Sequence, residues 1–254
     1  MSDLTAFSLA GKRILVTGAN TGIGQGIAVS IARAGGAVIG VGRSSMAETA
    51  SKVAALGGQF EAVAADLADT GAAGPMLGRV WDESGPLDGL VNNAGIIRRA
   101  DAVDLTVTDW DDVIDVNLKT AFLLCQSFAQ RILAEGRQGK IVNIASVLSF
   151  QGGIRVASYT ASKHGVLGIT RLLACEWAAK GINVNGIAPG YIETNNTQAL
   201  RADPDRSAAI LGRIPAGRWG EPGDIGDAAV FLLAPASNYM HGAVVPVDGG
   251  WLAR

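Results

Sequence analysis

The sequence predicts an α/β protein in which a mostly parallel sheet is covered by helices on both faces. Short apolar runs alternate with longer segments whose apolar residues recur at helical spacing, and glycines stand between them. The 254 residues are 48% hydrophobic and only 17% charged, with 34 glycines, which suits a buried parallel sheet joined by tight turns. Alternation of strands and helices implies right-handed crossovers, which place helices on both faces of the sheet.

The first part of the chain shows this alternation most clearly. A buried strand is expected over residues 12–17, and it runs directly into a glycine turn and a helix that ends near residue 34. The elements expected next are a strand at 37–42, a helix at 46–56, a strand at 60–64, a helix ending near 83 and a strand at 88–91.

The second part continues in the same order. The elements expected there are a long helix at 108–134, a strand at 140–145, a helix at 159–180, a strand at 182–187, a helix at 222–233 and a short strand at 244–247. Residues 191–218 have mixed polarity and several arginines, and we interpret them as a segment that covers the substrate. No linker is visible, so we expect one domain over residues 1–254.

The composition argues against a general affinity for nucleic acid or for anionic membranes. The formal net charge is −2, so an anion must be captured by local groups and not by an overall field. No run of 18 or more apolar residues is present, and the first ten residues have neither a basic n-region nor an apolar h-region. We therefore expect a cytoplasmic protein with no membrane or nucleic-acid partner.

The cysteines and histidines predict no metal site. Cys125 and Cys175 fall in apolar helical segments and form neither a Cys-x-x-Cys pair nor a ligand cluster, so we expect buried free thiols in a reducing compartment. The two histidines, His164 and His241, are not spaced like metal ligands. His164 follows Lys163 on a predicted helix and points elsewhere, so we interpret it as structural or surface.

A glycine turn connects the first predicted strand to the first helix. Gly18, Gly22 and Gly24 have the spacing G-x-x-x-G-x-G, which lets the backbone approach a pyrophosphate while the helix offers its free amides to the phosphates. The spacing alone also fits an ordinary strand-to-helix turn. The position directly after the first strand favours a phosphate site.

Tyr159 and Lys163 are four residues apart in a predicted helix, on one face and one turn from each other. A phenol with an ordinary pKa of about 10 exchanges protons poorly at neutral pH, and a nearby ammonium would lower that pKa. The Ser146 hydroxyl, at the end of the 140–145 strand, is placed to hold the same oxygen. Tyr-x-x-x-Lys alone also fits a surface helix, but this set predicts proton exchange with a carbonyl or alcohol as hydride moves.

Six motifs taken together resemble the short-chain dehydrogenase/reductase family in order and spacing. They are Thr17 to Gly24, Asn92 to Gly95, Asn117, Ser146, Tyr159 with Lys163, and Pro189-Gly190. The resemblance covers essentially the whole chain and implies a doubly wound, seven-stranded Rossmann sheet with a catalytic tetrad of Asn117, Ser146, Tyr159 and Lys163. It also implies that the lysine binds the nicotinamide ribose, that the asparagine holds a proton-relaying water, and that the loop after Pro189-Gly190 holds the carboxamide.

The resemblance further implies NADP or NAD as cofactor. The residues expected to contact it are Gly18, Asn20, Thr21, Gly22, Ile23, Gly24, Arg43, Ser44, Asp66, Leu67, Asn93, Ala94, Gly95, Tyr159, Lys163, Pro189, Gly190, Ile192 and Thr194. We expect Asp66 to accept from the adenine amino group. The second strand ends without a carboxylate for a ribose 2'-hydroxyl, while Arg43 and Ser44 suit a 2'-phosphate. Asn20-Thr21 adds no basic residue, and on balance the sequence favours NADP.

The loops around the tyrosine predict the substrate class. They resemble the branch of the family that acts on sugar acids, and they carry several arginines in an acidic chain, as a carboxylate requires. The residues expected to contact a keto or hydroxy sugar acid are Arg98, Ser146, Gln151, Arg155, Tyr159, Asn195, Asn196 and Arg201. Any one arginine is as well explained by solvation or by an acidic neighbour. Residue types do not separate keto-gluconates from the unsaturated uronates released from pectin or alginate.

Two other classes of protein share parts of this pattern. A 3-oxoacyl-carrier reductase has the same tetrad, but it would want a basic docking face and an open apolar channel, which this acidic chain with polar loops fits less well. A non-catalytic dinucleotide-binding scaffold could dispense with the tetrad, which is complete here.

The helices that carry Asn117 and Tyr159 have more apolar positions than one core-facing stripe needs. Excess apolar surface suggests self-association. The family resemblance implies a homotetramer built on these helices, and we expect Trp251 to Arg254 to reach a neighbouring subunit.

Overall fold

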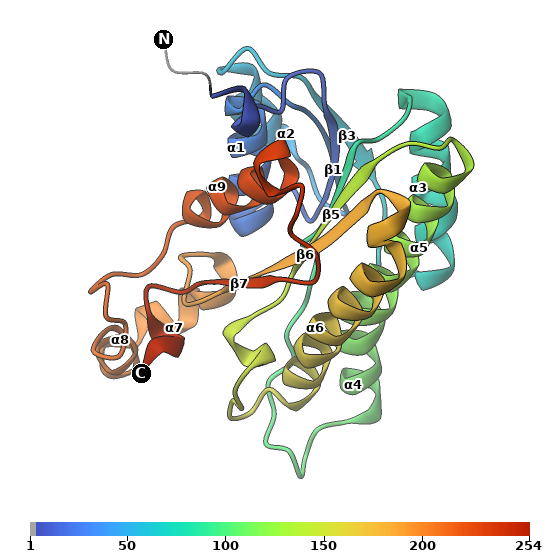
Figure 1. The fold of residues 1–254 in the computed structure, drawn as a ribbon. Helices are drawn as coiled ribbons and strands as arrows, with labels where there is room; N and C mark the ends of the chain where they lie inside the picture. Colours follow the sequence, from blue (N-terminus) through green and yellow to red (C-terminus); the bar gives the residue numbers. More distant parts are fainter. Residues whose placement is uncertain (1–3) are drawn as a thin grey trace.

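A computed structural model of the chain describes residues 4–254 and places one seven-stranded sheet within them (Figure 1). The first three residues of the N-terminal stretch considered above lie outside the described part. All neighbouring strands pair in parallel, in the order β3-β2-β1-β4-β5-β6-β7. The predicted α/β architecture with a parallel sheet is confirmed.

The strands begin and end within two residues of their predicted positions. They are β1 (Arg13–Thr17), β2 (Ala37–Gly42), β3 (Phe60–Ala64), β4 (Gly89–Asn92), β5 (Gly139–Ile144), β6 (Ile182–Pro189) and β7 (Val244–Val247). All residues of β4 and β6 are buried, whereas β3 at the sheet edge is largely exposed. Continuous apolar runs therefore mark the central strands, which helices cover on both faces.

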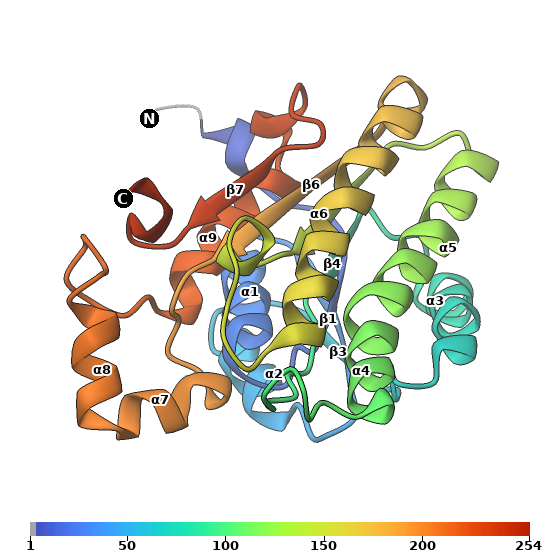
Figure 2. The ribbon, with the colours of Figure 1, turned by 90° about the horizontal axis from the view of Figure 1, so that it is seen from below.

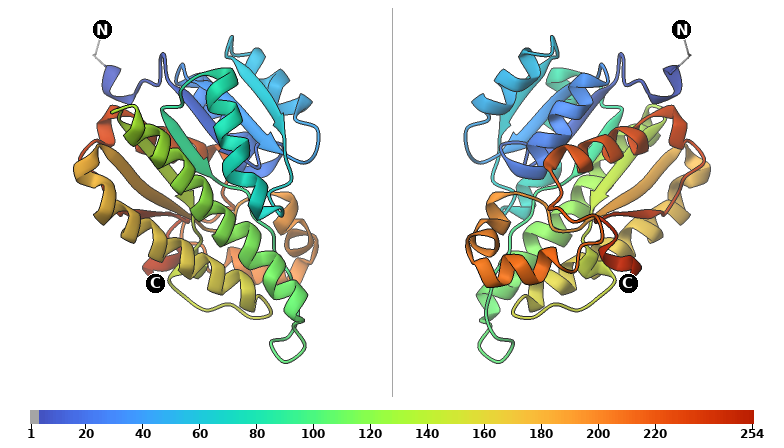
Figure 3. Two further views of the ribbon diagram at one scale, coloured as in Figure 1. Left: turned by 90° about the vertical axis from the view of Figure 1, so that its right-hand side faces the viewer. Right: turned by 90° about the vertical axis from the view of Figure 1, so that its left-hand side faces the viewer.

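Helices form two layers around the sheet, seen from opposite sides in Figure 3. The α-helices are α1 (Gly22–Arg33), α2 (Ala47–Ala54), α3 (Thr70–Ser84), α4 (Val107–Ile114), α5 (Thr120–Ala134), α6 (Ala157–Trp177), α7 (Gln198–Ala202), α8 (Pro204–Leu211) and α9 (Pro222–Leu233). Helices α1 and α9 pack together on one face, and α3, α5 and α6 cover the other.

The two faces of the sheet hold separate cores. Leu15 and Val16 are consecutive in β1, so their side chains point to opposite faces. Leu15 joins the core with Phe128 of α5, while Val16 joins the core with Ile27 of α1. The strand that precedes the glycine turn is thus fixed from both sides.

A buried hydroxyl holds the two central loops together. In the sheet, β2 and β3 lie on one side of β1 and β4 to β7 on the other, so the strand order reverses between β1 and β4, and a crevice opens at their carboxyl ends. Thr17 Oγ1 accepts hydrogen bonds from the backbone N–H groups of Asn93 (2.9 Å) and Ala94 (3.0 Å). This contact fixes the loop after β4 beside the loop after β1.

Helices α7 and α8 stand apart from the sheet layers, beyond the carboxyl ends of the strands (Figure 2). They lie within residues 191–218, the segment interpreted above as a cover. Asp203 caps α8 by accepting from the Arg206 N–H (3.1 Å), and Pro204 occupies its first turn. No helix in residues 4–254 is long and apolar enough to cross a membrane.

The two cysteines differ in their surroundings. Both are free, and Cys125 is fully buried, but Cys175 is exposed. The prediction that both are buried is wrong for Cys175, because it lies on the outward face of α6. His164 is exposed, as predicted, and its Nδ1 lies 3.0 Å from the Thr160 carbonyl oxygen.

Candidate active site

The turn after β1 has the backbone geometry of a phosphate-binding loop. Gly18 (φ 68°) and Gly22 (φ 55°) occupy left-handed conformations that favour glycine. A Cβ on Gly24 would overlap the carbonyl oxygen of Gly18, so only glycine allows this close approach. Helix α1 starts at Gly22, and Thr21 makes no side-chain cap, so the first amides face the crevice unused.

The far side of the crevice carries the residues predicted for the adenosine end. Asn20 Nδ2 donates to Ser44 Oγ (2.7 Å), which joins the glycine turn to the end of β2. Arg43 and Asp66 form a long ion pair (3.8 Å) between exposed side chains. Asp66 Oδ1 also accepts from the Ala68 N–H (3.0 Å).

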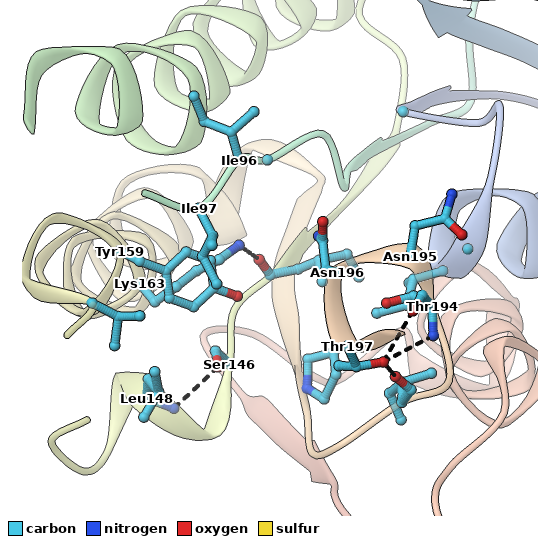
Figure 4. Close-up of a pocket in the computed structure, with 18 of the residues that line it drawn as sticks. Ile96, Ile97, Ser146, Leu148, Tyr159, Lys163, Thr194, Asn195, Asn196 and Thr197 are labelled. Atoms are coloured by element: carbon cyan, nitrogen blue, oxygen red, sulfur yellow. Dashed lines mark hydrogen bonds between the residues drawn. The ribbon is translucent and has the colours of Figure 1, made fainter. Parts of the chain in front are cut away.

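Tyr159, Lys163 and Ser146 meet at the opposite end of the crevice (Figure 4). Tyr159 and Lys163 come from α6, and the lysine Nζ lies 5.6 Å from the centroid of the tyrosine ring. Ser146 follows β5, and its Oγ accepts from the Leu148 N–H (3.1 Å). Ser149 fixes α6 to this turn because its hydroxyl donates to the Lys163 carbonyl oxygen (2.6 Å).

The electrostatics of this group differ from the expectation. Burial raises the pKa of the Tyr159 phenol, and Ser146 and the charge of Arg99 act in the opposite direction. Lys163 is 4% exposed and donates to the Ile144 carbonyl oxygen (2.6 Å), and burial lowers the pKa of its amine to about 8. Ser146 and Arg99 are thus the groups that lower the phenol pKa in the structure, and the effect predicted for Lys163 stays a prediction.

Asn117 lies in a π-helical turn (Asp115–Lys119) that interrupts the helix predicted over 108–134. Its Nδ2 donates to the Ile96 carbonyl oxygen (3.0 Å) and to Ser162 Oγ (3.2 Å), and its Oδ1 accepts from the Ile96 N–H (2.8 Å). Both amide protons are used, so Asn117 holds the loop after β4 against α6. Single π-helical turns are often found at functional sites.

One pocket of ≈1160 Å³ runs from the glycine turn to the covering segment. Every residue predicted to contact the dinucleotide lines it. So do six residues predicted to contact the substrate: Arg98, Ser146, Gln151, Tyr159, Asn195 and Asn196. Arg155 and Arg201 do not line the pocket, and Asn117 lies behind its wall.

The arginines predicted for the substrate are engaged elsewhere. Arg98 contacts Asp112 (2.9 Å) and Asp109 (3.3 Å), Arg155 contacts Asp101 (3.3 Å), and Arg201 contacts Glu193 (3.5 Å). The alternative reading, pairing with an acidic neighbour, holds for all three in the structure. Sequence alone does not reveal this, because the partners of Arg155 and Arg201 lie in loops whose conformation has no periodic pattern.

The pocket-lining residues that the predicted site set omitted include Arg99, Tyr191, Arg206, Arg213 and Trp251. Arg99 donates to the Asn196 carbonyl oxygen (3.2 Å). The sequence does contain a pattern that would have indicated Arg206 and Arg213. They are seven residues apart, which places them on one face of a helical segment. Trp251 is buried against Val147 and Ile214 of its own chain, so the predicted approach to a neighbouring subunit concerns only the residues after it.

Comparisons with known proteins extend over the same residues. A family model described as enoyl-(acyl carrier protein) reductase matches residues 18–252. The chain is 55% identical over 251 residues to 2-dehydro-3-deoxy-D-gluconate 5-dehydrogenase of Escherichia coli (strain K12), covering 99% of each protein. It is 40% identical over 252 residues to gluconate 5-dehydrogenase of Gluconobacter oxydans (strain 621H), covering 98% of each.

A solved structure from Agrobacterium tumefaciens is similar over 98% of this chain and 99% of its own, with 60% identity and a TM-score of 0.93. That protein is provisionally assigned as a 2-deoxy-D-gluconate 3-dehydrogenase and was crystallised with bound NADP. The names of these relatives refer to sugar acids, the substrate class that the loops predict. Since the matches span nearly the whole chain, and the parallel sheet carries the glycine turn and the Ser-Tyr-Lys group on one crevice, the chain belongs to the short-chain dehydrogenase/reductase family.

Proposed function

We propose that this protein is a nicotinamide-dependent oxidoreductase that interconverts a hydroxyl and a keto group of a sugar acid, as a 2-dehydro-3-deoxy-D-gluconate 5-dehydrogenase does. One observation carries the proposal: Ser146, Tyr159 and Lys163 occupy one end of a single pocket whose other end is the glycine turn. The full-length relatives with this name supply the substrate class.

The residues present fit the dinucleotide. The left-handed Gly18 and Gly22 and the free amides of α1 suit the pyrophosphate, and the loop that contains Ala94 suits the adenosine ribose. Arg43 and Ser44 at the end of β2, where no carboxylate stands, favour NADP, which several solved relatives contain. When bound, this cofactor supplies the hydride in reduction and accepts it in oxidation.

In the proposed reaction, Ser146 and Tyr159 hold the substrate oxygen. The Tyr159 hydroxyl gives its proton to a carbonyl oxygen during reduction and removes one from the alcohol during oxidation. Ser146 Oγ donates a hydrogen bond to the same oxygen and stabilises the negative charge that develops on it. The Lys163 ammonium lies one turn along α6, where it is placed to bind the nicotinamide ribose and to stabilise the phenolate.

Asn117 would contribute through the backbone of its π-helical turn. Its side-chain amide is occupied by Ile96 and Ser162, so a proton-relaying water beside Lys163 would have to be held by main-chain groups.

We also propose that residues 191–218 cover the bound substrate and that the protein assembles as a homotetramer. We further propose that it works in the cytoplasm, where the exposed thiol of Cys175 stays reduced.

A substrate panel tests the proposal. Purified protein is assayed with NADPH and NADH against 2-keto-3-deoxy-gluconate derivatives with a 5-keto group, 5-keto-gluconate, an unsaturated alginate-derived uronate and an acetoacetyl thioester. We expect turnover of a keto sugar acid, with higher kcat/KM for NADPH, and a loss of at least about 100-fold in kcat for Tyr159→Phe. A Tyr159→Phe enzyme as active as the parent would refute the proposed mechanism.

The thioester in the panel addresses the second candidate function. A 3-oxoacyl-carrier reductase is favoured by the description of the matching family model, which names acyl carrier protein. The pocket wall instead carries polar loops with Asn195, Asn196 and Gln151 and several arginines. Efficient reduction of the thioester with no turnover of any sugar acid would establish that candidate in place of ours.

A further inference from the structure

We infer that Arg206 and Arg213, together with Tyr191 and Trp251, form the subsite that binds the substrate carboxylate. We call these four residues the donor cluster. The inference rests on the proposed function for the identity of the ligand, but its geometry is independent of that function. Arg206 and Arg213 thus take the role that the sequence analysis expected of Arg155 and Arg201, because those two arginines pair with acids outside the pocket.

The covering segment presents one face to the pocket. Arg206, Ala209, Ile210 and Arg213 all line it, and their spacing of three, four and seven residues is that of one helical face. Helix α8 contains the first three, and Arg213 follows two residues after its end at Leu211. The two guanidinium groups therefore flank a small apolar surface along the pocket wall.

Neither of these arginines has an acidic partner. In residues 4–254 no carboxylate lies within 4.0 Å of Arg206 or Arg213, whereas Arg98, in the same pocket, has two. The Arg213 guanidinium lies 4.0 Å from the centroid of the Trp251 ring. Stacking on an aromatic ring holds a guanidinium while its N–H groups stay available for a bidentate contact with a carboxylate.

The aromatic members of the cluster add unpaired donors. Trp251 is 4% exposed, and its buried Nε1 has no hydrogen-bond partner among the described residues. A buried N–H without an acceptor is unfavourable, and a ligand that supplies an acceptor would relieve this cost. The Tyr191 ring lies 4.7 Å from that of Trp251, and no hydrogen bond of its hydroxyl is found in residues 4–254.

The positive charges of both arginines act on the Tyr191 phenol. Burial raises the pKa of this phenol, and the charges of Arg213 and Arg206 counteract that effect. The cluster therefore combines two positive charges and two neutral donors and contains no carboxylate. Such a set is complementary to an anion with several lone pairs, as a carboxylate is.

The position of the cluster fits the proposed substrate. In a 5-keto sugar acid the carboxylate carbon is four bonds from the reacting carbon, so the two ends must be bound by different residues. Arg99 influences the Tyr159 phenol and belongs to the reacting end. Tyr191 directly follows Pro189-Gly190 and extends the wall from the reacting end to the donor cluster.

Steady-state kinetics with matched substrates test the subsite. Arg206→Gln, Arg213→Gln and Trp251→Phe are compared with the parent, using the best keto sugar acid of the panel and its uncharged methyl ester. We expect KM for the acid to rise at least tenfold in each arginine variant and a few-fold in Trp251→Phe. KM for the ester and the Kd for NADPH should stay within about twofold of the parent values. Arg79→Gln, an exposed arginine of α3 outside the pocket, is the control.

A binding measurement separates this inference from the proposed function. Quenching of tryptophan fluorescence is titrated with D-gluconate, whose carboxylate needs no turnover to bind. Parent quenching that is lost in both arginine variants supports the subsite even if no keto acid is turned over. Unchanged KM for the acid in both arginine variants, or an equal rise for acid and ester, would overturn the subsite while leaving the proposed function intact.

Discussion

At the scale of the residue, the reactivity of Tyr159 depends on charges from separate elements. Burial alone would make its phenol a weaker acid, and Ser146 and Arg99 oppose that effect. Lys163, four residues away, is directed at the Ile144 carbonyl oxygen. Arg99, on the loop after β4, therefore acts on the phenol of a tyrosine that α6 carries.

Removing the charge of Arg99 should shift the pH dependence of the reaction. In the oxidation direction the phenol must be deprotonated, so activity rises with pH through the phenol pKa. Arg99→Gln raises that pKa, and we expect the rising limb of kcat/KM to move to higher pH. Arg99→Lys keeps the charge and should restore the parent profile. Equal shifts in both variants would show that the contact with Asn196, and not the charge, matters.

At the scale of the element, the interruption of the predicted 108–134 helix positions the site. The π-helical turn at Asp115–Lys119 directs Asn117 toward Ile96, so its amide fixes the loop that carries Arg98 and Arg99. The Ser162 hydroxyl, which accepts from the same amide, donates in turn to the Tyr159 carbonyl oxygen (2.8 Å). One side chain thereby links the loop after β4 to the helix that carries Tyr159.

Asn117→Ala should weaken this link. The substitution leaves the Ile96 N–H and C=O without their partner, which we expect to destabilise the protein by about 1–3 kcal/mol and to lower kcat at least tenfold. Thermal unfolding and steady-state kinetics measure the two effects. If Asn117→Ala has the same Tm and the same kcat as the parent, Asn117 neither positions the loop nor takes part in the reaction.

At the scale of the whole molecule, apolar side chains remain on the outer surface. Val107 and Trp110 of α4 are 76% and 40% exposed, and Leu172 of α6 is 50% exposed. These helices are adjacent. Much of the excess apolar content of α5 is instead internal, since Leu124, Cys125 and Phe128 belong to the core. Self-association should therefore involve α4 and α6 more than the sequence indicates.

Light scattering after size exclusion should give four times the chain mass of 26.0 kDa. Leu172→Glu places a charge on the exposed face of α6 and should shift the protein to a smaller species, because an unpaired charge in an apolar interface is unfavourable. Val103→Glu, on a loop, changes a more exposed apolar side chain (92%) and is the control. A monomeric parent, or an unchanged mass in Leu172→Glu, would contradict an interface built on α6.

The sequence by itself predicted the order of strands and helices along the chain, the glycine turn and the spacing of Tyr159 and Lys163. Apolar periodicity is local, a left-handed turn requires glycine at Gly18 and Gly22, and Tyr159 and Lys163 are one helical turn apart. Only the tertiary structure decided which arginines are available. Within residues 4–254, Arg98, Arg155 and Arg201 have acidic neighbours whereas Arg206 and Arg213 do not, and such pairing depends on how distant loops approach one another. The same holds for the phenol of Tyr159, because its pKa reflects burial and the position of Arg99, neither of which is set by spacing along the chain.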